Sequence, residues 1–170
     1  KEAIKYLYFY TENINSVSAL STFTNLEYLS IYGNTALTSL EGIKNLTTLK
    51  TIYAYSCGLT NLPNFATNSS LQYLSIYSNK GITTLSGLEN CKNLQSLYAY
   101  NCAITDVTSL SGNTALTYLS LYTNTNLVNV AAISSCTSIN NLYLANNTKM
   151  SVNDVKTLAP IIANCRKNYS

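Results

Sequence analysis

The stretch LQYLSIYSNKGITTL, from Leu71 to Leu85, decides how the rest of the sequence is interpreted. A related stretch, LQSLYAYNCAITDV, follows from Leu94 to Val107. Both follow the pattern Leu-x-x-Leu-x-Leu-x-x-Asn, with Ile, Ala or Cys at some of its places. Aligned on this pattern, repeat units begin at residues 4, 26, 49, 71, 94, 116 and 139, so their lengths alternate between 22 and 23 residues. A regular period of this length predicts a solenoid of stacked coils.

Each unit, numbered from its first residue, changes its apolar period once. Positions 1, 4 and 6 are apolar, while positions 3, 5 and 7 alternate with them and face the other side, as in a β-strand. Apolar residues then recur at every third position, which fits 3₁₀ turns; one such run is Leu37, Leu40, Ile43, Leu46 and Leu49. One unit cannot bury its own apolar face, whereas stacked neighbours can.

The units resemble the leucine-rich repeat family. LEYLSIYGN (26–34) and LTYLSLYTN (116–124) match its signature, and ENINSVSAL (12–20) and CAITDVTSL (102–110) resemble its short class, typified by bacterial internalins. LENCKNLQSL (88–97) is similar to surface repeats of gut commensals and Gram-positive bacteria. The resemblance covers roughly residues 4–147. It implies an α/β solenoid, a leucine-rich repeat horseshoe with a parallel concave β-sheet of about seven strands and a 3₁₀ or irregular convex side. For function it implies binding.

Position 9 needs a side chain that hydrogen-bonds the backbone where the chain leaves the strand. Asparagine or cysteine fills it in six units: Asn34, Cys57, Asn79, Cys102, Asn124 and Asn147. Glu12 departs from this pattern in the first unit. Cys91 and Cys136 share a convex position, three residues before the next unit. We expect all four of these cysteines to be buried structural residues rather than disulfide partners, nucleophiles or metal ligands.

The last twenty residues, SVNDVKTLAPIIANCRKNYS, break the repeat. Ser151 and Asp154 resemble a helix capping box, with Asp in place of the usual Glu or Gln. An apolar stripe at helical spacing follows: Val152, Val155, Leu158, Ile162 and Cys165. Pro160 should kink or split the helix. We predict a solenoid over residues 1–150 and a C-terminal helical cap over 151–170; a partner-binding helix is the alternative.

Tyrosine is concentrated on one face of the predicted sheet. Of the 15 tyrosines, all but Tyr169 occupy positions 3, 5 or 7. They are Tyr6, Tyr8, Tyr10, Tyr28, Tyr32, Tyr53, Tyr55, Tyr73, Tyr77, Tyr98, Tyr100, Tyr118, Tyr122 and Tyr143. Position 7 is tyrosine in six units and Ala145 in the seventh. At positions 3 and 5 tyrosine alternates between units with smaller polar residues, such as Ser30 and Ser75, which predicts a checkerboard that relieves crowding.

Two explanations of the tyrosines are compatible with each other. Tyrosine favours strands and packs against cross-strand neighbours. The tyrosine patch is also about 29 Å long, from six steps of about 4.8 Å between strands, which is larger than the exposed apolar patches usual on soluble proteins. Antibody paratopes favour Tyr and Ser, because Tyr gives rigid contact area and Ser adaptable hydrogen bonds. We expect all fourteen tyrosines to contact a ligand, and six central ones to dominate: Tyr53, Tyr55, Tyr73, Tyr77, Tyr98 and Tyr100.

Composition argues against several other classes of function. The chain has 170 residues, of which 10% are charged, and its net charge of +3 is too small to indicate nucleic-acid binding. It has no histidine, and its seven acidic residues are scattered, so we predict no catalytic residues, metal site or cofactor. No apolar run approaches the length of a membrane span, so no membrane insertion is expected.

The sequence therefore predicts a non-catalytic module that binds a protein or peptide on its tyrosine-rich sheet. A carbohydrate-binding surface, with tyrosine rings stacked on sugars, is one alternative. A self-associating scaffold, a homodimer through the concave face, is the other. We expect an extracellular or cell-surface bacterial protein whose signal peptide has been removed, and Lys1 to begin a mature form or a fragment.

Overall fold

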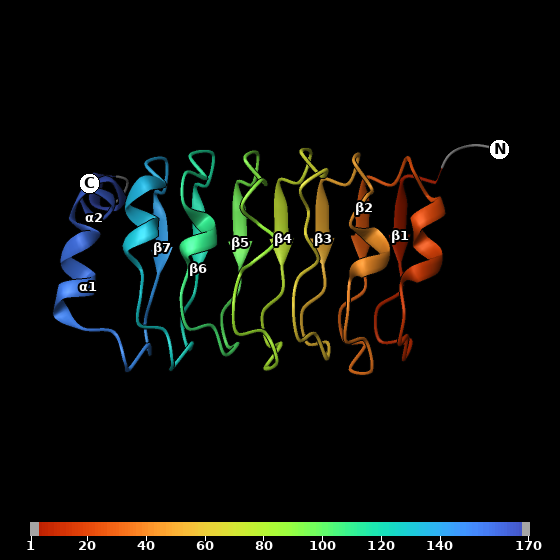
Figure 1. The fold of residues 1–170 in the computed structure, drawn as a ribbon, viewed down its shortest axis with the longest axis horizontal. Coiled ribbons are helices and arrows are strands. Elements are labelled where there is room, and N and C mark those ends of the chain that lie inside the picture. Colours follow the sequence, from red (N-terminus) through yellow and green to blue (C-terminus); the bar gives the residue numbers. More distant parts are fainter. Residues whose placement is uncertain (1–3, 168–170) are drawn as a thin grey trace.

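Seven strands of three residues each form one parallel sheet in which the order in space follows the order in the chain. In this computed structural model, which describes residues 4–167, the strands are β1 (Tyr6–Tyr8), β2 (Tyr28–Ser30), β3 (Thr51–Tyr53), β4 (Tyr73–Ser75), β5 (Ser96–Tyr98), β6 (Tyr118–Ser120) and β7 (Asn141–Tyr143). The coils stack side by side along one axis (Figure 1). Each strand pairs with the next without a shift in the repeat frame, so position 3 lies beside position 3. The predicted leucine-rich repeat solenoid is confirmed.

The convex side carries 3₁₀ helices in four coils: η1 (Ser18–Thr22), η2 (Glu41–Ile43), η3 (Thr108–Leu110) and η4 (Ala131–Ser135). The coils that begin at residues 49 and 71 have only turns and irregular backbone at this place. There Phe65 donates its backbone N–H to the Gly87 carbonyl of the next coil at 3.1 Å. Gly87 has φ +105°, and a Cβ at this residue would lie 2.2 Å from the Pro63 carbonyl oxygen. The predicted period of three is therefore met by 3₁₀ helices in four coils. In the other two it is met by separate turns with the same hydrogen bond to the third residue before, as from the Leu88 N–H to the Leu85 carbonyl at 3.2 Å and from the Cys91 N–H to the Leu88 carbonyl at 3.1 Å.

The inward positions 1, 4 and 6 form the core that joins neighbouring coils. Leu71, Leu74 and Ile76 of the central coil are all fully buried. The position-9 asparagines then fasten the bend after each strand. Asn79 donates from Nδ2 to the carbonyls of Ala54 (2.9 Å) and Ile76 (2.7 Å). One side chain therefore ties its own coil to the preceding one.

The position-9 pattern holds where cysteine replaces asparagine. The Cys57 thiol is buried and lies 3.3 Å from the Ile31 carbonyl oxygen of the preceding coil. Glu12 is exposed, and the ladder begins instead at Asn34, whose Oδ1 accepts the N–H of Glu12 (3.1 Å). Within the described residues the side-chain ladder therefore runs from the second unit onward.

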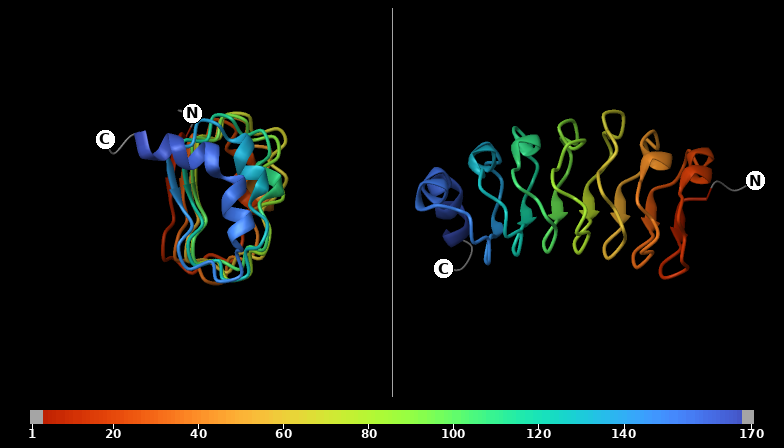
Figure 2. Two further views of the ribbon diagram at one scale, coloured as in Figure 1. Left: turned by 90° about the vertical axis from the view of Figure 1, so that its left-hand side faces the viewer. Right: turned by 60° about the horizontal axis from the view of Figure 1, so that its bottom comes forward.

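Two helices, α1 (Val152–Thr157) and α2 (Ala159–Lys167), lie across the last coil (Figure 2, left). The Ser151 and Asp154 side chains form the predicted capping box, with Ser151 Oγ accepting the Asp154 N–H at 3.2 Å. The chain breaks between the helices at Leu158, two residues before Pro160, as the proline predicts.

The predicted apolar stripe of this segment is wrong at one end. Val152 is 73% exposed and Val155 43% exposed, whereas Ile161, which the stripe left out, is buried with Leu158. The break at Leu158 rotates α2 relative to α1, so one helical periodicity does not run through both. Within residues 4–167, none of the helices is both long and apolar enough to cross a membrane.

Candidate functional site

Six tyrosines at position 7 form a continuous stack along the sheet, here called the flat row. Its members are Tyr10, Tyr32, Tyr55, Tyr77, Tyr100 and Tyr122. Ring centroids lie 5.0 Å apart between Tyr10 and Tyr32, and between 4.3 and 4.4 Å apart thereafter. The planes of neighbouring rings differ by only 3–11°. Each ring therefore covers the face of the next.

The tyrosines of positions 3 and 5 form a second continuous set, here called the zigzag row. Its members are Tyr6, Tyr8, Tyr28, Tyr53, Tyr73, Tyr98, Tyr118 and Tyr143. From Tyr8 to Tyr143 successive centroids are 4.5–5.6 Å apart, with planes 26–43° apart. Tilted contacts of this kind are favourable for aromatic rings, because the positive edge of one meets the negative face of another.

The cross-strand register explains why this row zigzags. In the position-5 column Tyr53 pairs with Ser30 on one side and Ser75 on the other. Both serines are buried, at 3% and 1% exposure. The small residues leave space for the Tyr53 ring, which contacts the rings of Tyr28 (5.6 Å) and Tyr73 (4.8 Å) in the other column. The checkerboard expected from the sequence is present, and it converts two half-filled columns into one unbroken row.

Because the interior rings of the flat row are stacked on both faces, they leave their edges and hydroxyl groups, rather than their faces, to meet a partner. Interior members are half-buried, and only the end members are exposed: Tyr6, Tyr8, Tyr10 and Tyr143. Burial raises the pKa of Tyr118 from 10.0 to about 12, and neighbouring tyrosines add to the effect. Burial also raises the pKa values of Tyr55, Tyr73 and Tyr100. These hydroxyls therefore stay protonated and uncharged at neutral pH.

Charged groups lie at the rim of the sheet and not on its face. No charged residue occupies position 3, 5 or 7 of any unit. At position 2, Glu27 lies between Lys5 and Lys50, with both nitrogen–oxygen distances at 2.7 Å. Hydrogen bonds from these two lysines lower the Glu27 pKa to about 2. The three side chains together carry one net positive charge, and the face of the sheet beside them carries none.

A row of left-handed bends follows the flat row. Every position-8 residue has a positive φ, from 52° at Ser56 to 76° at Gly33. The backbone N–H of this residue donates to the position-7 carbonyl of the next coil, as from Ser56 to Tyr77 at 2.9 Å. Because the bond recurs from coil to coil, it holds the position-7 residues at a constant spacing.

All fourteen tyrosines predicted from the sequence therefore lie together on one face, in one row or the other; Tyr169 lies outside the described residues. Their contact with a ligand stays a prediction. The sequence did not reveal that the ring faces would be covered, because this depends on side-chain torsions. The sequence did show where the flat row ends, because position 7 is Ala145 in the last unit instead of tyrosine.

Chemistry-bearing groups do not converge elsewhere in the described part of the chain. The five cysteines are free thiols, and burial raises the Cys102 pKa to about 11 and the Cys91 pKa to about 12. Residues 4–167 hold no group of three or more Cys, Asp or Glu side chains placed to bind a metal ion. Cys57, Cys91, Cys102 and Cys136 are buried, as their positions in the repeat predict, while Cys165 of α2 is half-buried.

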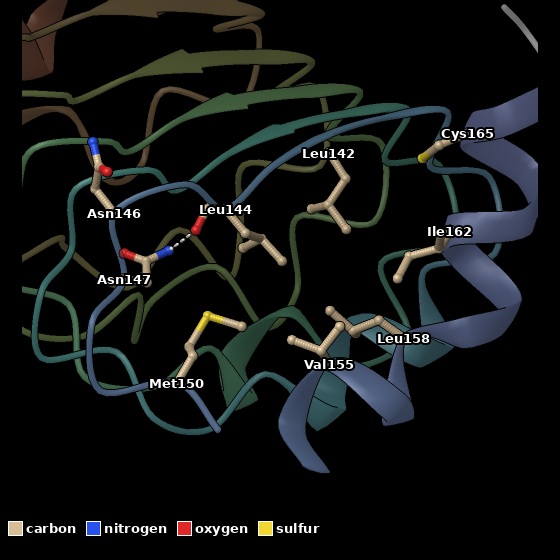
Figure 3. A pocket seen from close by; sticks show the side chains of 9 residues that line it. All are labelled: Leu142, Leu144, Asn146, Asn147, Met150, Val155, Leu158, Ile162 and Cys165. Atoms are coloured by element: carbon tan, nitrogen blue, oxygen red, sulfur yellow. Dashed lines mark hydrogen bonds between the residues drawn. The ribbon is translucent and has the colours of Figure 1, made fainter. Parts of the chain in front are cut away.

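An apolar hollow of about 630 Å³ lies between the last coil and the two helices (Figure 3). Leu142 and Leu144 line one side of it, and Val155 and Ile162 the other. Asn147 lies at one end, with its side-chain nitrogen donating to the Leu144 carbonyl at 2.9 Å. The hollow results from loose packing of α1, whose residues are not buried, and it offers few polar groups to orient a ligand.

Residues 92–135 match the family model described as leucine-rich repeats, two copies. No curated protein sequence matches the chain. Two solved internalins of Listeria monocytogenes are similar in structure. One, inlC2, has a TM-score of 0.72 and 24% identity, covering 93% of this chain and 77% of that one. The other, inlF, has a TM-score of 0.64 and 24% identity, covering 88% and 49%.

A leucine-rich repeat protein of Leptospira interrogans is also similar, with a TM-score of 0.71 and 21% identity over 87% of this chain and 44% of that one. The chain thus spans about half the length of two of these structures. At these identities the likeness is one of fold. The expected resemblance is confirmed: the chain carries leucine-rich repeats and has the solenoid fold of the internalins.

Proposed function

We propose that this leucine-rich repeat solenoid is a non-catalytic module that binds a protein or peptide on its two tyrosine rows. The observation that carries the proposal is the unbroken stacking of fourteen rings along seven strands, with no charge among them. Leucine-rich repeat proteins in general act in protein interactions, which agrees with this use of the sheet. All fourteen tyrosines are candidate contacts, and the central ones should contribute most.

The rows favour binding because their rings are already held in place. Tyr77 is stacked on both sides, on Tyr55 and on Tyr100, each at 4.3 Å. An immobilised side chain loses little further conformational entropy when a partner covers it, and that loss is a main cost of association. The outward ring edges and hydroxyls suit the carbonyl oxygens and aromatic faces of a polypeptide.

The same geometry argues against a sugar stacked on the rows. Stacking on a pyranose needs a free ring face, and each interior ring of the flat row has a neighbouring ring stacked on both of its faces. A glycan could therefore use only hydroxyl hydrogen bonds along most of the surface. Self-association through the same face remains an alternative. The fold shared with internalins supports an extracellular or cell-surface location on a bacterium, and this location is part of the proposal.

The test starts from peptides selected on the wild-type protein from a random peptide library, whose affinities are then measured against two triple variants. In the first, Tyr77, Tyr98 and Tyr100 become Ser; in the second, they become Phe. We expect the Ser variant to lose at least tenfold in affinity, because it removes three central rings. Removing a single hot-spot side chain already costs about 2 kcal/mol or more of binding free energy. The Phe variant keeps the ring edges and should lose less.

The matched control replaces an exposed convex pair, Glu41→Ser with Lys44→Ser, which removes a 2.9 Å ion pair far from the rows. It should bind as the wild type does. Equal binding by a folded Ser variant would refute the proposal. Binding on a glycan array without peptide binding would favour carbohydrate, and a concentration-dependent mass in solution would favour the homodimer. Because the face is uncharged, the peptide affinity should change little with salt.

A further inference from the structure

The flat row ends one coil before the sheet does. Tyr122 stacks on Tyr100 at 4.3 Å with planes 11° apart, and within residues 4–167 this is the single ring stacked on Tyr122. On its other side lies the coil of β7, where position 7 is Ala145 and not tyrosine. Ala145 is exposed. One face of the last ring in the row is therefore left without a ring partner.

The backbone at this place continues the row without distortion. Thr123 donates its N–H to the Ala145 carbonyl at 2.9 Å, as Asn101 does to the Tyr122 carbonyl one coil earlier at 3.0 Å. Ala145 therefore stands where a seventh ring would stand, one strand spacing beyond Tyr122. The small side chain leaves the second face of the Tyr122 ring without a ring partner beside the exposed Ala145 methyl group, and this place is here called the slot.

The wall of this slot is aromatic, and the outward-facing residues of the last strand and bend, Asn141, Tyr143 and Ala145, are uncharged; the nearest charged residue in the chain is Lys149, in the bend. Tyr143, two residues before Ala145 on the same face, is 41% exposed and contacts only Tyr118 among the rings of the described chain. Asn146, which follows Ala145, is exposed and sits in the left-handed bend with φ 60°. An entering ring would meet a flat aromatic face on one side, a ring edge near it, and an amide at the rim.

We propose that the slot between Tyr122 and Ala145 receives one aromatic side chain of the partner, which becomes the seventh ring of the flat row. This rests on the proposed binding function and names the feature that the partner must carry. The row itself shows what fits, since five successive contacts between uncharged phenol rings are made at 4.3–5.0 Å. A sugar ring is the competing occupant, because this is one of the few free ring faces.

The slot is tested without the natural partner, by NMR titration of the whole chain with the tripeptides Gly-Tyr-Gly and Gly-Leu-Gly and with methyl β-glucoside. The backbone amide signals of residues 145 and 146 are the readout, since a ring bound beside them shifts these signals and both amides are present in the wild type and in every variant. We expect Gly-Tyr-Gly to bind about two- to tenfold more tightly than Gly-Leu-Gly, which is the range of an aromatic pair. Ala145→Tyr should abolish this difference by filling the slot, and Ala145→Ser should preserve it.

Folding of the Ala145→Tyr variant is checked by its circular dichroism, and Tyr122→Leu, which removes the ring face but leaves the slot open, is the second variant. It too should abolish the preference for Gly-Tyr-Gly. Equal binding of the two tripeptides, or a preference that survives both variants, would overturn the proposal. So would binding of methyl β-glucoside in place of the peptide.

The two proposals can fail separately. If selected peptides bind Ala145→Tyr as well as wild type but lose affinity for the central Ser variant, the slot is refuted and the binding function stands. If Gly-Tyr-Gly occupies the slot while the central Ser variant keeps full affinity for the selected peptides, the slot stands and the binding function of the rows is refuted.

Discussion

Tyr77 at the centre of the flat row provides a quantitative test of ring stacking. Its ring makes two stacked contacts, with Tyr55 and Tyr100, each at 4.3 Å and within 9° of parallel. Each such pair contributes about 0.5–1.5 kcal/mol beyond its buried area. Tyr77→Leu keeps an apolar side chain but removes both contacts, so we expect it to lower the free energy of unfolding by about 1–3 kcal/mol.

Two further variants isolate the cause. Tyr77→Phe keeps both contacts and should stay within about 0.5 kcal/mol of the wild type. Tyr10→Leu removes one contact, at 5.0 Å and at an exposed end, so it should cost about half as much as Tyr77→Leu. Urea unfolding followed by circular dichroism measures all three. If Tyr77→Leu were as stable as Tyr77→Phe, stacking would not hold the row together.

Three further predictions concern backbone strain, a buried amide and pH. Thr123 has φ 58°, which is costly for a β-branched residue, so Thr123→Gly should raise the free energy of unfolding by about 0.5–1 kcal/mol, while Thr125→Gly should lower it by a similar amount in the same urea assay. The buried Asn68 Oδ1 lacks a hydrogen-bond partner, whereas Asn113 Oδ1, at the same place two repeats later, accepts from the Lys92 ammonium at 2.9 Å. Thr47 precedes Asn68 by the same 21 residues, so Thr47→Lys should supply the missing donor and raise the free energy of unfolding by about 1 kcal/mol, seen as a higher urea midpoint. The folded-state pKa of Tyr118, about 12, lies above its ordinary value of 10.0, so its contribution is fully present below pH 10 and is lost as pH rises toward 12; unfolding followed across this window should show falling stability together with delayed phenolate absorbance, and titration of every tyrosine near 10 would contradict this.

The architecture could be predicted because the spacing of apolar residues and asparagines is the same in nearly every leucine-rich repeat. Burial of Leu71, Leu74 and Ile76 follows from one apolar triplet per coil, and the ladder of Asn79 follows from the single polar position at the bend. Each of these features depends only on which side of the chain a residue faces. A period of 22 or 23 residues therefore fixes the strands, the core and the face on which the tyrosines lie.

The details that sequence could not supply depend on how side chains and helices orient. The diagonal contact of Tyr53 with Tyr73, at 4.8 Å, results from side-chain torsions that bend the ring toward the neighbouring column over a buried serine. In the cap, Pro160 correctly predicted a break, but not the rotation that exposes Val152 and buries Ile161. The candidate face was therefore located from sequence, while what it presents, edges and hydroxyls instead of ring faces, was not.

Hydroxyl-radical footprinting of the wild-type chain, with and without a selected peptide, tests most directly whether the tyrosine rows bind a partner. The oxidation of each side chain is read by mass spectrometry. We expect the peptide to protect Tyr55, Tyr77 and Tyr100, whose outward ring edges it would cover, and to leave the exposed convex residue Val128 unchanged. Protection of Val128 with unchanged oxidation of the three tyrosines would contradict binding on the rows.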